Sequence, residues 1–193
     1  MRDLKSVVAA VNEYSDESID EVSETSEEII DEELIIIDWR EYDDAIVETI
    51  AEKVSSTDQM SAELLDGELW VYFNDERYKL PLTMSGHDRY VTISSLAWLL
   101  RDKYDFWLMA INIEDDTHQI LITSKVESEK LNDEYKEFVK NQLVQLQIGF
   151  DYFNCVDIPY LEHENNATIV FPDHKAQELA KTELEKKPWW KLW

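Results

Sequence analysis

The sequence predicts an α+β protein with a mainly antiparallel sheet, formed by a meander and a central hairpin and packed by three to five helices. Three observations predict this class. Asp66-Gly67 lies between two β-type segments and is the clearest hairpin signal in the chain. Residues 106–113 and 119–123 are apolar and flank an acidic turn, so the chain reverses and the two strands pair antiparallel. Elsewhere, apolar residues recur at helical spacing.

Composition favours one folded domain of high negative charge. The 193 residues include 44% hydrophobic side chains, enough for a sizeable core. Acidic residues outnumber basic ones by 43 to 18, which gives a formal net charge of −25. Phosphate binding needs clustered lysine and arginine, so this charge argues against nucleic-acid binding. It favours either a basic protein partner or simple solubility through charge repulsion.

The first 33 residues divide into two segments. Residues 1–14 are predicted to form a short amphipathic helix, because Leu4, Val7 and Val11 fall near helical spacing. Residues 15–33 are rich in Asp, Glu and Ser and contain no Lys or Arg, so the favoured interpretation is a mobile linker. The alternative is an acidic arm that docks on a basic partner. Its carboxylates are Glu27, Glu28, Asp31, Glu32 and Glu33.

Residues 34–185 are predicted to form a single α+β domain. It begins with a buried strand at residues 34–37, which are apolar and mostly β-branched. A helix follows, in which Ile46, Ile50 and Val54 form one apolar stripe. The meander strands come next, at residues 62–65, 68–73 and 78–82.

The second half of this domain is arranged around the central hairpin. A helix carrying Leu96 and Leu100 precedes the hairpin; it is expected to be capped by Ser94 or Ser95 and to end at Asp105. Three further elements follow from periodicity and capping residues. They are a helix from a cap at Asn132 to Leu146, a strand at residues 168–171 and a helix at residues 174–186.

Aromatic residues mark two candidate partner-binding regions. In residues 68–73, Trp70 and Tyr72 alternate with aliphatic side chains and therefore share one face of the strand. Residues 186–193 form a tail with three lysines and three tryptophans, namely Trp189, Trp190 and Trp193. We expect this tail to dock on the protein itself or on a partner. The alternative is contact with a membrane interface, which the acidic body disfavours.

One turn offers a candidate metal site. Asp115, Asp116 and His118 supply oxygen and imidazole donors, which suit magnesium, manganese or zinc, although Asp is also an ordinary hairpin-turn residue. The three glycines match neither a dinucleotide-binding fingerprint nor a phosphate-binding loop. Cys155, the single cysteine, has apolar neighbours and suits a buried structural thiol. We expect no cofactor and no catalytic residue.

The N-terminus resembles neither a signal nor a transit peptide, and no stretch approaches the roughly 18 apolar residues of a membrane span, so we expect a cytoplasmic protein. Size, charge and the lack of a catalytic motif are typical of toxin-neutralising immunity proteins and of nucleic-acid mimics. The favoured function is an acidic interaction module that binds a basic partner protein, with inhibition of that partner as one outcome. The alternatives are a metal-dependent enzyme or enzyme relic that uses the turn of Asp115, Asp116 and His118, and a membrane-peripheral adaptor held by the tryptophan tail.

Overall fold

Two antiparallel sheets organise the computed structural model, which describes residues 2–16, 21–38, 40–82, 88–112, 117–151, 156–157, 160–163 and 168–170. The central sheet has the strand order β1-β6-β5-β7. Its strands are β1 (Leu34–Asp38), β5 (Tyr104–Met109), β6 (Thr117–Ser124) and β7 (Leu143–Gln145). The second sheet contains the meander β2 (Met60–Leu65), β3 (Glu68–Phe73) and β4 (Glu76–Lys79), extended beyond β4 by β10 (Tyr160–His163) and β11 (Thr168–Val170). A short ladder joins β8 (Phe150–Asp151) to β9 (Val156–Asp157).

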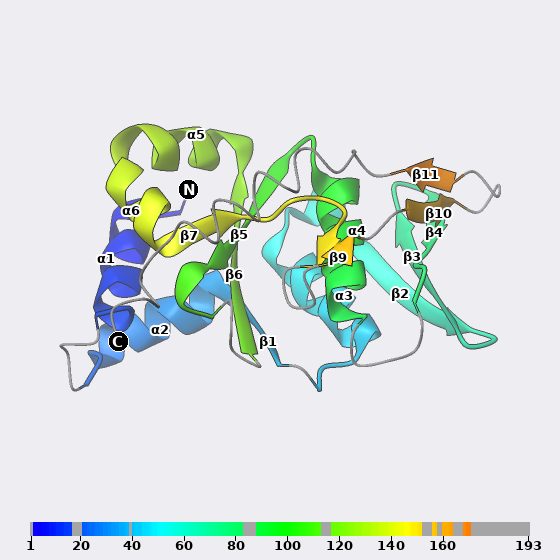
Figure 1. The fold of residues 1–193 in the computed structure, drawn as a ribbon, viewed down its shortest axis with the longest axis horizontal. Coiled ribbons are helices and arrows are strands. Elements are labelled where there is room, and N and C mark those ends of the chain that lie inside the picture. The colour runs from blue at the N-terminus through cyan, green and yellow to red at the C-terminus, as the bar shows by residue number, and fades with distance from the viewer. Residues whose placement is uncertain are drawn as a thin grey trace.

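Helices and sheets alternate as four layers (Figure 1). The outer helical layer contains α1 (Leu4–Tyr14), α2 (Glu24–Glu33), α5 (Lys125–Glu134) and α6 (Lys136–Gln142), and it covers one face of the central sheet. The inner helical layer contains α3 (Asp43–Lys53) and α4 (Arg89–Leu100), and it separates the central sheet from the second sheet. Single 3₁₀ turns, η1 (Ser56–Asp58) and η2 (Ala110–Asn112), occur in the connections.

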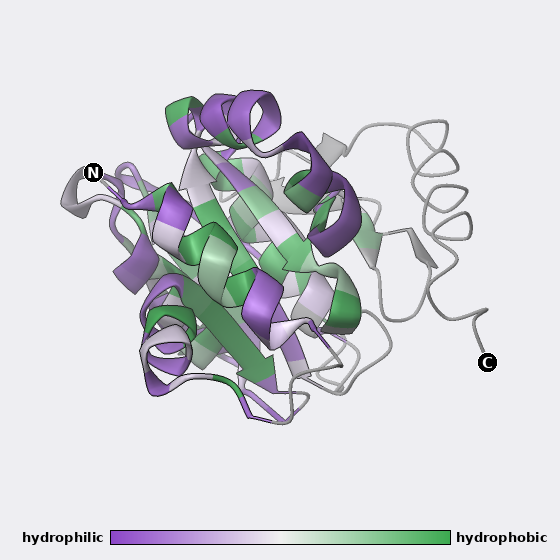
Figure 2. Ribbon diagram, turned by 90° about the vertical axis from the view of Figure 1, so that its left-hand side faces the viewer, coloured by the Kyte–Doolittle hydropathy of each residue, from purple (hydrophilic) through white to green (hydrophobic). Residues whose placement is uncertain are grey.

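The alternation of side chains along the central strands creates two cores, one on each face of the sheet. In β5, Phe106 and Leu108 belong to the core shared with α3, α4 and the second sheet. Trp107 and Met109 belong to the core shared with α1, α5 and α6. Figure 2 shows the resulting pattern, with hydrophobic central strands behind helices whose outer sides are hydrophilic. The central sheet is therefore buried on both faces.

The predicted α+β class with antiparallel pairing is confirmed, and both the meander and the central hairpin form. The prediction that they share one sheet is wrong, because the meander belongs to the second sheet and the hairpin to the central sheet. The meander begins at the predicted turn, where Asp66 and Gly67 both have positive φ, 52° and 83°. Leu69 and Val71 are buried on the face toward α3 and α4. The hairpin turn depends on two adjacent residues, and the local sequence therefore predicts it.

The predicted number of three to five helices is wrong, because the described residues already contain six. Helix α2 forms within the acidic segment; it is capped by the side chain of Ser23 and buries Ile30. The helix expected to run to Leu146 is interrupted at Tyr135, whose backbone (φ −125°, ψ 40°) is not helical, and it gives way to strand β7 at Leu143.

The start and end of the helix before the central hairpin also differ from the prediction. Helix α4 begins at Arg89, after Asp88, so Ser94 and Ser95 lie inside the helix and are fully buried. Asp105 belongs to β5 rather than to the helix end. No helix among the described residues is long and apolar enough to span a membrane. Cys155 and the predicted helix at 174–186 lie outside the described residues.

Candidate functional site

Negative charge is concentrated in residues 6–52. This range contains 17 acidic side chains and one basic side chain, Arg40. The structure folds this part of the chain into α1, α2, β1 and α3. Nine of its carboxylates are exposed on or beside α2 and α3, and we call these nine the acidic surface. They are Glu24, Glu27, Glu28, Asp31, Glu32, Glu41, Asp44, Glu48 and Glu52.

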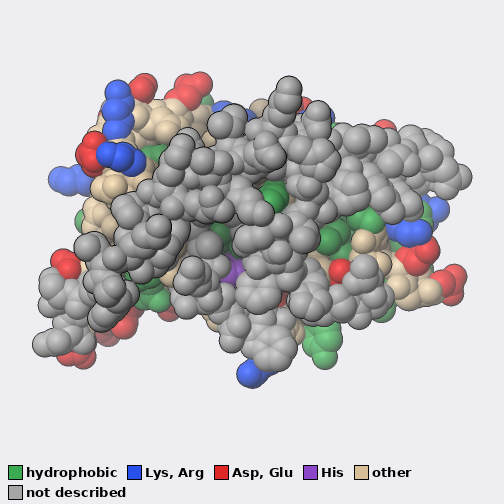
Figure 3. All heavy atoms as spheres, viewed as in Figure 1, with side chains coloured by type: hydrophobic (Ala, Val, Ile, Leu, Met, Phe, Trp, Pro, Cys, Tyr) green, Lys and Arg blue, Asp and Glu red, His purple; other side chains and the backbone are tan. Residues whose placement is uncertain are grey.

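The two helices that carry the acidic surface lie on opposite faces of the central sheet and both contact its edge strand β1 (Figure 1). Lys53, at the end of α3, donates from Nζ to the backbone oxygen of Glu32 over 2.5 Å. Arg2 forms an ion pair with Glu33 at 2.5 Å. At the lower left of Figure 3, beside α2, the visible charged side chains are acidic, whereas at the upper left lysine and arginine stand beside acidic side chains.

The spacing of these carboxylates opposes helix stability. Glu24, Glu28 and Glu32 follow one another at four-residue intervals on α2, and such like-charge pairs destabilise a helix by about 0.2–0.5 kcal/mol each. Glu32 also lies in the last turn, where the helix dipole disfavours anions, and that turn contains no basic residue. Asp44 and Glu48 repeat the pattern on α3. The helix dipole favours Glu24 and Glu27 in the first turn of α2, so it is the charge in the second half of this helix that is maintained against local helix stability.

Helix α2 is nevertheless held firmly to α1. The carboxylate of Glu13 accepts hydrogen bonds from the backbone and hydroxyl of Ser23, at 2.7 and 3.2 Å, and from the hydroxyl of Ser26 at 2.7 Å. These bonds, the one from Ser26 above all, lower the pKa of Glu13. Ile30 is 3% exposed. The acidic segment from Glu24 onward is thus a packed helix that presents its carboxylates from a fixed position.

Apolar and aromatic side chains accompany the acidic surface. Tyr42, between Glu41 and Asp43, is 78% exposed, and Ile36 in β1 is 44% exposed. Tyr14 lies at the end of α1 and is also exposed. Exposed tyrosines among charged groups are typical of interface anchors.

Trp70 and Tyr72, predicted as partner-binding residues, lie on the far side of the molecule from α2 (Figure 1). Both are half-buried on the face of β3 that points away from α3 and α4. The guanidinium of Arg77 stacks 4.7 Å from the Trp70 ring centroid, and the Tyr72 hydroxyl donates to Glu63 over 2.7 Å. That hydrogen bond raises the pKa of Tyr72. The structure does not bring this aromatic pair together with the carboxylates of α2.

The predicted metal turn is only partly described. His118 lies in β6, fully buried, and its ring centroid is 5.2 Å from that of Tyr90 in α4. No group of three or more metal-ligating side chains occurs among the described residues. The other predicted site residues lie outside the described residues: Asp115, Asp116, Trp189, Trp190 and Trp193.

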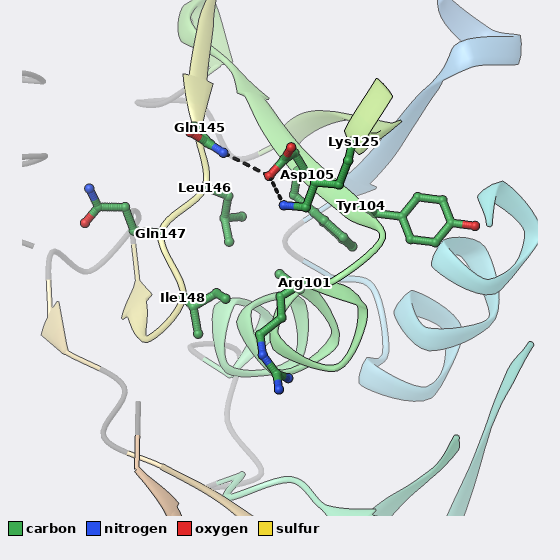
Figure 4. A pocket seen from close by; sticks show the side chains of 10 residues that line it. Arg101, Tyr104, Asp105, Lys125, Gln145, Leu146, Gln147 and Ile148 are labelled. Carbon is green, nitrogen blue, oxygen red and sulfur yellow. Dashed lines mark hydrogen bonds and ion pairs between the residues drawn. The ribbon is translucent and has the colours of Figure 1, made fainter. Parts of the chain in front are cut away.

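A cavity of about 290 Å³ opens where α4 ends and β5 begins (Figure 4). On its rim, Asp105 accepts at Oδ1 from Lys125 Nζ over 2.7 Å and from Gln145 Nε2 over 3.0 Å. Arg101 lines the opposite side, where its guanidinium stacks 3.9 Å from the ring centroid of Trp98 and donates to the Trp98 backbone oxygen over 2.6 Å. Asp105, Lys125 and Gln145 are thus engaged with one another, and Arg101 is engaged with Trp98.

Sequence reasoning missed this cavity because its walls come from separate regions of the chain. Residues 97–106 supply one wall, Lys125 begins α5, and residues 145–148 follow β7. No spacing in the sequence links these segments. Only the antiparallel pairing of β5 with β7 brings Asp105 and Gln145 together.

A second buried polar group lies where α3 and α4 begin. Asp43, in the first turn of α3, accepts a hydrogen bond from the Thr92 hydroxyl of α4. Burial raises the pKa of Asp43, and repulsion from Asp88 and Asp44 adds to this effect, while the bond from Thr92 opposes it. The fold therefore favours the protonated form of Asp43.

We expect Asp43→Asn to stabilise the protein at pH 7 relative to Asp44→Asn. Both changes remove a carboxylate from the first turn of α3, but only Asp43 is desolvated. Because the folded state raises the pKa of Asp43, its destabilising charge fades as the pH falls, and wild-type stability approaches that of Asp43→Asn. Urea denaturation at pH 7 and at a pH near the ordinary aspartate pKa of about 3.9 measures both effects. An advantage of Asp43→Asn that is the same at both pH values would show that the charge is not the cause.

Comparison of the chain with known protein families, with characterised proteins and with solved structures gave no match. Its function has to be argued from its own residues.

Proposed function

We propose that this protein is an acidic interaction module that binds a basic partner protein through the acidic surface on α2 and α3. The observation that carries the proposal is the concentration of 17 acidic side chains against one basic side chain between Ser6 and Glu52. This region supplies more than half of the formal net charge of −25. The carboxylates in the second half of α2 are held at mutually repulsive spacing and near the helix end that disfavours anions, and we place their benefit in what they bind.

A basic partner supplies that benefit. A surface of one sign raises the rate of encounter with an oppositely charged protein and rejects partners of like charge. Once the partner is bound, its lysines and arginines relieve the repulsion within α2 and α3. Inhibition follows if the basic surface that becomes covered is the partner's own functional site.

Apolar anchors add to the electrostatic attraction. Tyr42 and Ile36 are exposed beside the carboxylates, and their burial in a complex removes apolar surface from water. The charge selects the partner and the anchors slow its release. The proposal places the protein in the cytoplasm, where its single cysteine stays reduced.

Charge reversal on α2 tests the proposal. The triple variant Glu28→Lys, Asp31→Lys, Glu32→Lys is expected to reduce capture of the basic partner at least tenfold. All three side chains are exposed, and lysine suits the last turn of a helix, so the variant should fold. The measurement is capture from the native lysate at low salt by full-length bait, with identification by mass spectrometry and elution over a salt gradient.

The matched control reverses three carboxylates on α5 and α6. The variant Glu129→Lys, Asp133→Lys, Glu137→Lys changes the net charge by the same amount at exposed positions away from α2. It should retain capture. Equal loss in both variants would show that net charge alone drives binding, and capture of no basic protein at all would overturn the proposed function.

A further inference from the structure

Strand β1 forms an edge of the central sheet. Within the part of the chain that the structure describes, it pairs only with β6, from Leu34 opposite Leu121 to Asp38 opposite Thr117. The backbone groups on the other side of an edge strand are a template for a further strand. The Leu34 amide already donates to the Ile30 oxygen, and the Asp38 oxygen accepts from the Glu41 amide. The part of this edge where the sheet can be extended is therefore centred on Ile36, which is 44% exposed.

β1 lacks the features that usually protect an edge. Its sequence, Leu-Ile-Ile-Ile-Asp, contains no lysine and no proline, and its register with β6 is unbroken, so it has no bulge. At the opposite edge of the sheet, β7 has only three residues. The outer strand of the meander, β2, carries the exposed charge of Glu63. β1 is longer than β7 and more apolar than β2.

The carboxylates beside β1 decide what can pair with it. A strand added at this edge directs successive side chains to the two faces of the sheet in turn. One face carries α2 and the other carries α3, so both sets of side chains approach part of the acidic surface. A strand rich in lysine and arginine is attracted on both faces. A second copy of this chain would bring its own α2 and α3 carboxylates to the same place and be repelled.

We infer that β1 accepts an extended, positively charged segment of the partner protein as a fifth strand of the central sheet. The inference rests on the proposed function and specifies how the partner is held. Main-chain hydrogen bonds to β1 supply affinity, and the carboxylates of α2 and α3 select basic side chains. Ile36, exposed on β1, contacts an apolar residue of the added strand.

A pair of synthetic peptides separates strand pairing from charge attraction. The first is an eight-residue L-peptide, Lys-Lys-Val-Val-Lys-Lys-Val-Val, which directs lysines to both faces of the sheet. The second has the same sequence with D-valine, which keeps the charge but prefers backbone angles that an L-strand does not adopt. We expect the full-length protein to bind the first peptide at least tenfold more tightly. Hydrogen exchange should slow at the amide of Ile36 with the first peptide only.

The variant Ile36→Lys provides the matched mutational test. It places the charge that commonly protects natural edges on β1 and should weaken binding of the L-peptide at least tenfold. Leu64→Lys makes a similar change at an exposed position of β2 and should leave binding unchanged. The side chains of Ile36 and Leu64 are both exposed, so neither variant should disturb the fold.

The outcomes distinguish this inference from the proposed function. If both peptides bind with equal affinity and the charge reversal on α2 weakens the binding of both, the proposed electrostatic binding is supported and strand pairing is overturned. If neither peptide binds, strand pairing is overturned, and capture of a basic protein decides the proposed function separately. If the protein alone sediments as a dimer with a protected amide at Ile36, the edge is occupied by a second copy and the assigned occupant is wrong.

Discussion

Ile30→Ala lowers the free energy of unfolding by about 2–4 kcal/mol, the usual effect of truncating a buried isoleucine. Ile30 is 3% exposed and is the apolar anchor of α2, whose other apolar residue, Ile29, is half-buried. The measurement is urea denaturation followed by circular dichroism. A loss of this size means that α2 unfolds cooperatively with the rest of the protein.

Ile36→Ala is the control, because it makes the same exchange six residues later at a position that is 44% exposed. Its effect should stay below about 1 kcal/mol. If the two variants lose the same small amount, the acidic segment does not pack as a helix, and its carboxylates are presented by a flexible arm.

The second large effect is expected for Asp58→Asn, which should lower stability by about 2 kcal/mol at pH 7. Asp58 is 2% exposed, yet its carboxylate accepts from the ammonium of Lys103 and from the Tyr104 hydroxyl, the latter at 3.0 Å. Tyr104 in turn accepts from the Ser55 backbone over 3.0 Å. The carboxylate therefore ties η1 to the start of β5.

The pH dependence of this effect follows from the pKa of Asp58. Burial alone would raise that pKa, but the hydrogen bonds from Lys103, Tyr104 and Thr57 outweigh burial and hold it below its ordinary value. The stabilisation is therefore complete above the unfolded-state pKa of about 3.9 and disappears as the pH falls through the folded value. Urea denaturation at pH 7 and pH 3 measures the difference between wild type and variant. If the stability difference between wild type and variant is the same at both pH values, the effect comes from packing and not from charge.

Lys103→Met separates the ion pair from the tyrosine bond. The Lys103 side chain is 59% exposed, so its removal leaves little buried surface unfilled. It does leave the Asp58 carboxylate buried without its cation, so the cost of Lys103→Met includes that of an uncompensated buried charge. A double-mutant cycle with Asp58→Asn gives the coupling between the two charges.

The elements that sequence predicted correctly depend on neighbouring residues. The turn at Asp66-Gly67 and the stripe of Ile46 and Ile50 each need only a few adjacent positions. Helix α2 was harder to predict, because its acidic composition opposes helix formation and its stability comes from contacts with α1, ten or more residues away.

Strand β1 shows a different limit. Four consecutive apolar residues at 34–37 indicate burial on both faces, which is common for a strand in the middle of a sheet. β1 is instead an edge strand, and the helices on its two faces provide the burial. The local pattern of apolar residues indicates whether the two faces of a strand are covered. It does not indicate the place of β1 in the sheet, which is set by pairing with β6, about 80 residues later.

The candidate site divides in the same way. The carboxylates of α2 were identified from composition, because a run without Lys or Arg is visible in the sequence itself. The acids of α3 and the exposed Ile36 join them only through the fold. The placement of Trp70 and Tyr72 on the far side of the molecule depends on how the layers stack, which no local pattern contains.

The long interval between β1 and its pairing partner has a consequence during synthesis. Ile37 leaves the ribosome about 80 residues before His118, the residue opposite it. At ordinary elongation rates the apolar strand waits roughly 4 to 16 seconds for β6. In that time the dense negative charge on either side of it keeps nascent chains apart, as charged gatekeepers do beside aggregation-prone segments. We therefore expect the carboxylates that we propose to bind a partner also to protect the nascent chain from association.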